Sequence, residues 1–421
     1  MKYLFIHQNY PGQFKHLAAA LVATPGNQIA AIVDEKNAKE AAASLPANAV
    51  LLTYASPPGA RAETHQYLRS YEVAIRRGQQ VARLLLTMKE KGYSPDIICV
   101  HAGWGEALFI KEVFPDAFVL GYFEFFYRTE GADVGFDTEF YKNSLDDNCR
   151  IKIRNSLHLV SMEYCDWGLT PTVWQASQLP EGYRPKVSVI HEGVNTETVR
   201  PDPQAIFEVN EDLSLSASDQ VVTFVNRNLE PYRGFHIFMR ALPTILEACP
   251  QAHVVLVGGD DVSYGRKPES SENWRQVMMQ EVGSSLDMSR MHFVGKLPYA
   301  KYLKLLQISS AHVYLTYPFV LSWSMLESMA AGCAVIASNT APVTEVIQHG
   351  HDGLLVDFFD HQAIAENVIE VIRHPEKYLA MRQAARQTIL ERYDLEKVCL
   401  PQQLDLLRNL PDYIAGANKP M

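Results

Sequence analysis

The sequence lacks several features that would place it in specialised protein classes. No segment approaches the roughly 18 uninterrupted apolar residues of a membrane-spanning helix. The six cysteines are scattered without a close pair, which argues against a zinc site and a disulfide framework and favours a reducing, cytoplasmic compartment. Basic residues are outnumbered 38 to 48, and this acidic balance makes nucleic acid a poor partner. No cluster of His, Cys and carboxylates has metal-ligand spacing, so we predict no metal site.

What remains is ordinary globular chemistry. The chain has 421 residues, of which 47% are hydrophobic and 20% charged, and this length suggests two or three domains. The apolar run at residues 3–6 is too short for a signal peptide, and no small-residue cleavage site follows it. We expect this run to be a buried first strand.

Short apolar runs alternate with longer helical patterns in both halves of the chain. The predicted strands are 3–7, 28–33, 96–100, 118–123 and 167–171, then 221–226, 253–258, 292–294, 311–315 and 334–337. The predicted helices are 13–22 and 64–91, then 234–248, 299–307 and 324–331. Such alternation predicts parallel sheets covered on both faces, an α/β fold of two doubly wound, Rossmann-like domains. Ligands bind outside the carboxyl ends of such strands, so chemistry is expected in the loops there.

A linker separates the two halves. Residues 189–203 run from a strand into Gly193 and Asn195 and then into two prolines, which is typical of a domain boundary. We therefore predict domains at 1–192 and 193–397.

The most informative stretch is 317–338, where a loop of small and aromatic residues opens a helix carrying Glu327, and an Ala331-Gly332 elbow leads into an apolar strand. The N–H groups of a helix N-terminus form a site for an anion such as a diphosphate. With the continuation at 345–356 and the interdomain segment, this stretch resembles the donor-site signature of glycosyltransferase family 4, bacterial group 1 type. These are retaining, nucleotide-sugar-dependent enzymes of GT-B fold.

The resemblance implies two Rossmann-like domains facing a central cleft, with the terminal segment 398–421 packing back on the first domain. It implies sugar transfer from a nucleoside-diphosphate sugar to a hydroxyl of a glycan, lipid-linked or small-molecule acceptor, in polysaccharide or glycoconjugate biosynthesis. The sequence has no Asp-x-Asp cation mark, so we expect metal-independent catalysis without a further cofactor. A GT-B nucleotide-sugar epimerase and a non-catalytic sugar-nucleotide binder remain open as alternatives.

Arg227 and Arg233 are the predicted diphosphate clamp. They follow the strand 221–226 at the spacing that the family uses, a Gly or Asn before Arg, five residues, then a basic residue and Gly. Cleaving the bond to a sugar's anomeric carbon builds negative charge on the leaving diphosphate, which fixed cations stabilise. Arginine suits this role because its planar fork binds phosphate and stays charged. The alternative is that both are surface arginines with buried stems.

The remaining donor-site residues come from the same resemblance. Glu327 is expected to bind the ribose hydroxyls, and Gly295-Lys296 to lie near the nucleobase. In the segment Ser322-Trp323-Ser324, the two serines are either hydroxyl donors to the diphosphate or helix N-caps. One departure matters: the family has a glutamate eight positions before Glu327, and here that position is Phe319.

Three residues of the first half are candidate site residues: Gly12 for donor binding, and His101 and Glu124 for the reaction centre. Gly12 lies between the first strand and helix, in a loop whose backbone can approach phosphates or acceptor, although no GxGxxG fingerprint is present. His101 and Glu124 follow two later strands, and a packing role is the alternative for each. The basic, partly apolar stretch 64–91 is either an ordinary amphipathic helix or a peripheral membrane contact at the inner face of the membrane.

Overall fold

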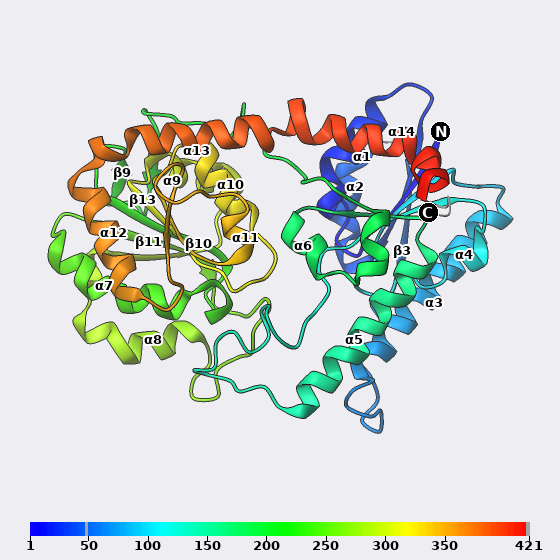
Figure 1. Cartoon of the computed structure of the whole chain (residues 1–421), viewed down its shortest axis with the longest axis horizontal. Coiled ribbons are helices and arrows are strands. Elements are labelled where there is room, and N and C mark those ends of the chain that lie inside the picture. The colour runs from blue at the N-terminus through cyan, green and yellow to red at the C-terminus, as the bar shows by residue number, and fades with distance from the viewer. Residues whose placement is uncertain (47–48, 418–421) are drawn as a thin grey trace. The chain divides into compact units, whose positions relative to one another are not determined.

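The structure is a computed structural model that describes residues 1–46 and 49–417, with side chains described up to Leu410 (Figure 1). The chain divides into two compact units. Unit 1 contains residues 1–135, 141–192 and the C-terminal segment from Glu396 onward, and unit 2 contains residues 136–140 and Gly193–Leu395. The sequence-based division placed residues 136–140 in the first domain, and the structure places them in unit 2. Phe136 contacts the unit 2 rings of Tyr317, Phe358 and Phe359, a long-range packing that no local pattern encodes.

Unit 1 is built on a seven-stranded, wholly parallel sheet in the order β3-β2-β1-β4-β5-β6-β7. Its strands are β1 (Lys2–Ile6), β2 (Gln28–Asp34), β3 (Val50–Tyr54), β4 (Ile97–His101), β5 (Phe118–Tyr122), β6 (Trp167–Thr170) and β7 (Val187–Val189). The strand order reverses direction between β1 and β4, and in doubly wound sheets this switch point is where ligands bind.

Both faces of this sheet are buried. Leu4 and Ile6 pack into one core together with Val81, while Phe5 packs into the other with Leu17. The covering helices are α1 (Lys15–Ala23), α2 (Ala38–Ser44), α3 (Arg69–Glu90), α4 (Ile110–Val113), α5 (Leu145–Tyr164), α6 (Val173–Gln178) and α14 (Leu400–Ala417). Burial on both faces explains why the strands read as continuous apolar runs.

Unit 2 repeats this architecture. Its six-stranded sheet has the order β12-β11-β10-β13-β14-β15, so the switch point lies between β10 and β13. The strands are β10 (Val221–Asn228), β11 (His253–Gly259), β12 (Met291–Gly295), β13 (Ala311–Tyr314), β14 (Val335–Ser338) and β15 (Leu354–Val356), and all their pairings are parallel. A separate antiparallel pair, β8 (Ile206–Glu208) and β9 (Ser214–Ser216), precedes the sheet.

Helices cover both faces of this second sheet too. Phe224 of β10 stacks on Phe238 with ring centroids 4.7 Å apart, whereas Val225 faces the other core. The helices are α7 (Phe235–Ala248), α8 (Trp274–Val282), α9 (Tyr299–Ile308), α10 (Trp323–Ala330), α11 (Ala341–Thr344), α12 (His361–Arg373) and α13 (Leu379–Arg392). The predicted α/β class with two doubly wound domains is therefore confirmed.

The C-terminal segment begins with a π-helical turn, Leu395–Cys399, that leads into α14. Leu406, Leu407 and Leu410 of α14 join the unit 1 core that contains Leu17, and α14 contacts α1 (Figure 1). The segment predicted to pack on the first domain was 398–421, of which residues 418–421 lie outside the described part of the chain.

Two helix expectations need correction. The helix expected over 64–91 begins at Arg69, because residues 62–68 form turns in which Thr64 hydrogen-bonds to Glu72 instead of extending the helix. Helix α5 was not predicted, although a capping box marks its start. There the side chains of Ser144 and Asp147 each bind the other residue's backbone N–H.

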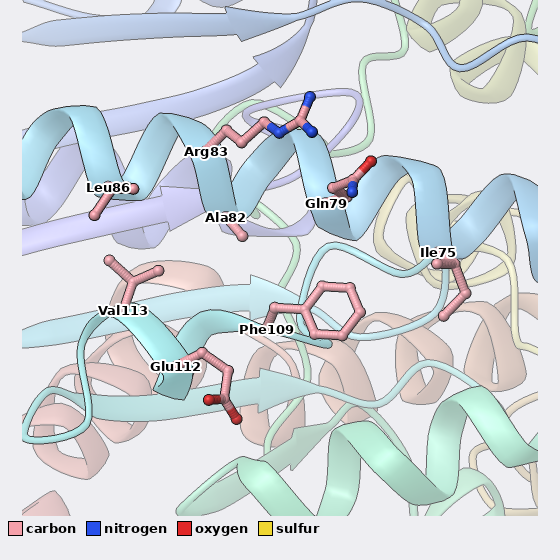
Figure 2. A pocket seen from close by; sticks show the side chains of 8 residues that line it. All are labelled: Ile75, Gln79, Ala82, Arg83, Leu86, Phe109, Glu112 and Val113. Atoms are coloured by element: carbon pink, nitrogen blue, oxygen red, sulfur yellow. The ribbon is translucent and has the colours of Figure 1, made fainter.

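An open apolar groove of about 400 Å³ lies between α3 and α4 (Figure 2). Its lining residues are Ile75, Gln79, Ala82, Arg83, Leu86, Phe109, Glu112 and Val113. Within the described residues, none of the helices combines the length and the apolar character needed to cross a membrane. The membrane contact through residues 64–91 stays a prediction.

Candidate functional site

Arg227 lies at the carboxyl end of β10, at the switch point of unit 2. The pairing between β10 and β11 shifts register between Val225 and Asn228, and Arg227 lies within this irregularity. Such bulges redirect side chains at strand ends. The Arg227 side chain is exposed and makes no hydrogen bond or ion pair with any described residue. Its guanidinium is therefore available to an anionic ligand.

Arg233, the second predicted clamp residue, is buried and already has protein partners. Its Nη1 donates to Thr316 Oγ1 at 2.6 Å, to the Val320 carbonyl at 3.0 Å and to the Tyr314 hydroxyl at 3.3 Å. All three acceptors belong to β13 or the loop that joins it to α10. Arg233 thus fixes the loop that carries the predicted donor-site motif, and its charge lies beneath that loop.

Gly234 explains how this loop comes so close to β10. Its φ is +69°, and a Cβ atom there would lie 2.4 Å from the Cβ of Leu315. Only glycine accommodates both the left-handed backbone and this approach. The Arg233-Gly234 pair therefore has a structural role. Arg233 hydrogen-bonds the loop after β13, and Gly234 lets that loop pack closely against the chain that follows β10.

The loop ends at the N-terminus of α10, which Ser322 caps. Ser322 Oγ accepts from the Ser324 N–H, and the Ser322 N–H donates to the Tyr314 hydroxyl at 2.9 Å. The Met325 N–H bonds the Ser322 carbonyl. The N–H groups of Ser324 and Met325 thus have partners within the protein, and the anion site at this helix start stays a prediction. Of the two alternatives for Ser322, the structure shows the helix N-cap. The Ser324 Oγ lies 2.9 Å from the Ser322 Oγ. The side chain between them, Trp323, is 47% exposed.

Glu327 projects from α10 toward α9 and is half-buried. Its Oε1 accepts from the Tyr299 hydroxyl at 2.7 Å and its Oε2 from the Tyr302 hydroxyl at 2.8 Å. Burial, together with the Glu327 charge, raises the pKa of the Tyr302 hydroxyl well above its usual value, so it remains a donor. A carboxylate with two fixed donors still has lone pairs for further hydroxyl groups.

Gly295 and Lys296 lie where β12 ends, just before α9 begins. Gly295 has a φ of +66° and open space on its Cβ side, and Lys296 is exposed. The Lys296 Cε lies 2.8 Å from the position that a Cβ on Gly259 would take, so its stem covers the end of β11. Tyr299 follows Lys296 within one turn and donates a hydrogen bond to Glu327. The predicted residues Gly295, Lys296 and Glu327 therefore lie at the same edge of the sheet.

Phe319 is buried in an aromatic cluster that the sequence did not predict. Its ring lies 4.9 Å from that of Tyr264 and 5.4 Å from that of Tyr232. The loop bearing Tyr264 is held by Glu230, whose carboxylate accepts the N–H groups of Ser263, Tyr264 and Gly265. Where the family has an acid, this chain has an apolar packing residue.

The switch point of unit 1 gathers the other predicted residues. Gly12 has a φ of +48°, and a Cβ there would lie 2.4 Å from the His7 ring, so the loop after β1 folds tightly over that imidazole. His7 Nδ1 accepts the Asn9 N–H at 2.9 Å, which leaves the proton on Nε2, 2.7 Å from Gln13 Oε1. Gln13 Nε2 in turn donates to Glu124 Oε1 at 3.1 Å.

His101 completes this arrangement. Its ring stacks on Trp104 with centroids 3.7 Å apart, and its Nδ1 accepts the Gly103 N–H at 3.2 Å. The His101 Nε2 lies 3.6 Å from Glu124 Oε2 and has no hydrogen-bond partner among the described residues. The structure thus brings Gly12, His101 and Glu124 together, and each lies at or after the carboxyl end of β1, β4 or β5.

The electrostatics of this group favour an ionised Glu124 beside neutral His7. Burial alone would raise the Glu124 pKa, but the neighbouring His101 and the hydrogen bond from Gln13 stabilise the carboxylate, and the net pKa is lowered. Burial, followed by the nearby His101, lowers the pKa of His7 to about 3. A carboxylate that stays charged and is 37% exposed can accept hydrogen bonds from a hydroxyl ligand.

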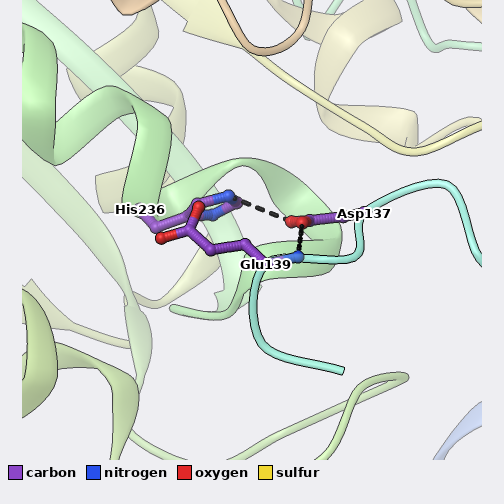
Figure 3. Close-up of side chains that lie close together, drawn as sticks. All are labelled: Asp137, Glu139 and His236. Atoms are coloured by element: carbon purple, nitrogen blue, oxygen red, sulfur yellow. Dashed lines mark hydrogen bonds and ion pairs between the residues drawn. The ribbon is translucent and has the colours of Figure 1, made fainter. Parts of the chain in front are cut away.

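Sequence reasoning missed His7, Gln13 and the two tyrosines that orient Glu327. His7 could have been found, since it ends the first predicted strand just before the Gly12 loop. It also missed a cluster of Asp137, Glu139 and His236, whose possible ligand atoms lie within 4.8 Å of one another (Figure 3). His236 is distant in sequence from the two acids, so residue spacing gave no metal signal.

Comparisons with known proteins agree with this architecture. Residues 25–199 match the family model described as Glycosyl transferase family 4 group, and residues 207–388 match that of Glycosyl transferases group 1. Together the two models span most of the chain.

Two curated relatives illustrate the range of similar proteins. A D-inositol 3-phosphate glycosyltransferase from Corynebacterium urealyticum is 25% identical over 244 residues, which is 56% of this chain and 55% of the relative. A GDP-mannose-dependent alpha-(1-6)-phosphatidylinositol monomannoside mannosyltransferase from Mycobacterium tuberculosis is 28% identical over 198 residues, 47% of this chain and 49% of the relative. The match thus spans about half the length of these relatives.

Solved structures share the whole fold. Anabaena HepE in complex with UDP superposes with a TM-score of 0.69 at 16% identity, covering 97% of this chain and 100% of that one. Sucrose-phosphate synthase from Thermosynechococcus elongatus gives 0.72 at 17% identity, covering 98% and 99%. With both family models matched and the GT-B fold present, this chain belongs to glycosyltransferase family 4, group 1 type.

Proposed function

We propose that the protein is a retaining glycosyltransferase that moves a sugar from a nucleoside-diphosphate sugar to a hydroxyl acceptor. The observation that carries the proposal is Arg227, an exposed guanidinium at the switch point of unit 2 that has no partner among the described residues. In a member of this family, such a cation at a strand's carboxyl end is suited to the donor diphosphate.

The donor site we propose divides the work among three groups. Arg227 binds the diphosphate directly, and Arg233 supports it from below by fixing the loop between β13 and α10. Glu327, oriented by the two tyrosine hydroxyls, accepts hydrogen bonds from the ribose. Fixed charges of this kind stabilise a leaving diphosphate more than the bound substrate.

The chemistry we propose needs no protein nucleophile and no metal at the donor diphosphate. The bond between the anomeric carbon and the diphosphate oxygen breaks, and the acceptor oxygen bonds to the same face. The departing diphosphate takes the acceptor's proton. Glu124, kept ionised and held by Gln13, accepts a hydrogen bond from an acceptor or sugar hydroxyl and so orients it.

The relatives guide the choice of substrates to test. Solved forms of HepE are named as complexes with UDP and UDP-glucose, and the mycobacterial relative is named as GDP-mannose-dependent. We therefore propose a UDP- or GDP-sugar donor and a hydroxyl acceptor that is a glycan, a lipid-linked sugar or a small polyol, in polysaccharide or glycoconjugate biosynthesis.

A donor screen tests the proposal. Thermal shift with UDP-, GDP- and ADP-sugars should identify one stabilising nucleotide, and release of that nucleoside diphosphate should depend on an added acceptor. NMR of the product should show the donor's anomeric configuration. Interconversion of the sugar without acceptor would indicate an epimerase, and binding without turnover would indicate a non-catalytic binder. If none of the three nucleotides binds, the donor site is wrongly assigned.

Arg227→Ala provides the site-specific test, with Arg200→Ala as the matched control. Arg200 is another exposed arginine of unit 2 and has no part in the proposed site. We expect the Arg227 variant to lose the nucleotide-induced shift while the control keeps it.

A further inference from the structure

Residues 136–140, here called the strap, belong to unit 2 although the chain on both sides of them belongs to unit 1. Phe136 packs 5.2 Å from Tyr317 and 5.3 Å from Phe358, measured between ring centroids. Phe140 packs 4.6 Å from Trp274. Two aromatic anchors thus hold the strap at its ends, and the polar residues between them face the first turn of α7.

The polar middle of the strap meets a buried histidine (Figure 3). His236 is fully buried, and its Nε2 lies 3.1 Å from Asp137 Oδ2. This contact is an ion pair without the geometry of a well-directed hydrogen bond, and the His236 Nδ1 has no hydrogen-bond partner within the described residues. The Asp137 side chain is 2% exposed, and the Glu139 carboxylate completes a set whose ligand atoms all lie within 4.8 Å. A buried imidazole without a well-directed hydrogen bond, aimed at two carboxylates, needs an explanation.

We propose that Asp137, Glu139 and His236 bind a divalent transition-metal ion, with zinc the best match. One imidazole nitrogen and two carboxylate oxygens suit zinc, whereas magnesium and calcium prefer oxygen alone. Two ligands of a tetrahedral zinc lie roughly 3.3 Å apart when each bond is about 2.0–2.1 Å. The observed separation of 3.1 Å between His236 and Asp137 is close to this value. Glu139 lies at the surface, so water fills the fourth position.

The surroundings of the cluster already orient its carboxylates. The Tyr317 hydroxyl donates to Asp137 Oδ2 at 2.7 Å, and the Glu139 N–H donates to Asp137 Oδ1 at 2.9 Å. Arg240 pairs with Glu139 and also with Glu281. Such outer partners orient metal ligands in known sites. Because Arg240 also pairs with Glu139, the metal ion and the guanidinium share one carboxylate, which lowers the metal affinity of the site.

The metal fastens the strap to unit 2. Two ligands come from the strap and one from α7, so an ion between them ties two parts of the chain that are distant in sequence. Tyr317, which supports Asp137, belongs to the same loop as the acceptors of Arg233. The site thus joins the strap to α7 and lies outside the proposed chemistry.

Zinc binding to the full-length protein tests this inference directly. After removal of metal with a chelator, we expect the protein to take up one equivalent of zinc, measured by mass spectrometry of the metal, and to melt at a higher temperature. Magnesium should give neither effect. His236→Gln and Glu139→Gln should each lower zinc affinity at least tenfold. His361→Gln, which removes an exposed histidine of the same unit, should bind zinc as the wild type does.

Two outcomes would overturn the proposal. One is a wild-type protein that takes up no zinc, and the other is a Glu139→Gln variant that binds zinc as tightly as the wild type. Glu139 is exposed, so this second variant keeps the test valid even if His236→Gln fails to fold. Zinc content is measured without turnover, and failure of the proposed function would leave the result unaffected.

Discussion

The two predicted clamp arginines should separate into a ligand-binding residue and a loop-fixing residue. Arg233→Ala removes a buried guanidinium whose Nη1 donates to Thr316, Val320 and Tyr314. Hydrogen bonds to a charged group contribute about 1.5–3 kcal/mol, and these three share one nitrogen, so the loss is about 3 kcal/mol. For a unit of this size that corresponds to about 6–12 °C in melting temperature.

Arg227→Ala should behave differently because this side chain has no partner within the described part of the chain. Its effect on the free energy of unfolding should stay within about 0.5 kcal/mol. Loss of one donor to the developing charge should nevertheless lower kcat/KM by about 100-fold. Arg233→Lys keeps the charge but loses the planar fork, so it should recover only part of the stability.

The assay combines thermal unfolding with donor-dependent turnover for the three variants and Arg200→Ala. If Arg227→Ala unfolds as early as Arg233→Ala, the Arg227 side chain stabilises the fold and is not a free ligand-binding group. If Arg233→Ala melts like the wild type, the reasoning from its buried hydrogen bonds fails. Near wild-type turnover in Arg227→Ala would remove it from the donor site.

Further predictions concern the remaining groups of the two switch points. Tyr302→Phe removes one hydrogen bond to Glu327 and should raise the KM for the sugar donor a few-fold with kcat nearly unchanged, as steady-state kinetics would show. An unchanged KM would mean that Glu327 does not bind the sugar donor. Gln13→Ala removes the only side-chain amide that donates to the Glu124 carboxylate among the described residues. It should lower kcat/KM for the acceptor more than kcat/KM for the sugar donor. Equal losses would contradict a role of Glu124 on the acceptor side. The free energy of unfolding should fall as the pH drops from about 6.5 toward 3, because histidines of the unfolded chain then bind protons while the buried histidines of the folded protein stay neutral. Each such histidine lowers the free energy of unfolding by about 1.4 kcal/mol per pH unit. Urea unfolding measures this change, and a pH-independent stability would refute the prediction. The histidines with a pKa lowered to about 3 by burial are His7, His158 and His312.

Local pattern was enough to predict much of the fold. Apolar runs buried on both faces gave the positions of most strands, and the repeat of strand and helix gave two doubly wound domains. The edge strands β3 and β15 were missed, although central strands of similar length, such as β4 and β14, were predicted. The helix α5 was missed although Ser144 and Asp147 mark its start.

The candidate site was predicted residue by residue but not in its interactions. The sequence singled out Arg227, Arg233 and Glu327 because each stands in a motif at a strand end or on an early helical turn. Which arginine is exposed and which is buried depends on how closely the β13–α10 loop approaches Gly234, and no local rule predicts that.

The sequence by itself determined the fold class, the family and the strand ends where ligands bind, since these follow from periodicity and from residues close together in the chain. Only the tertiary structure decided that Arg233 bonds a loop, that His7 and Gln13 hold Glu124, and that Asp137 and Glu139 meet His236. The physical reason is that each of these contacts joins elements that are neighbours only across a folded sheet or core. Their geometry is set by packing of the whole unit, which residue spacing does not record.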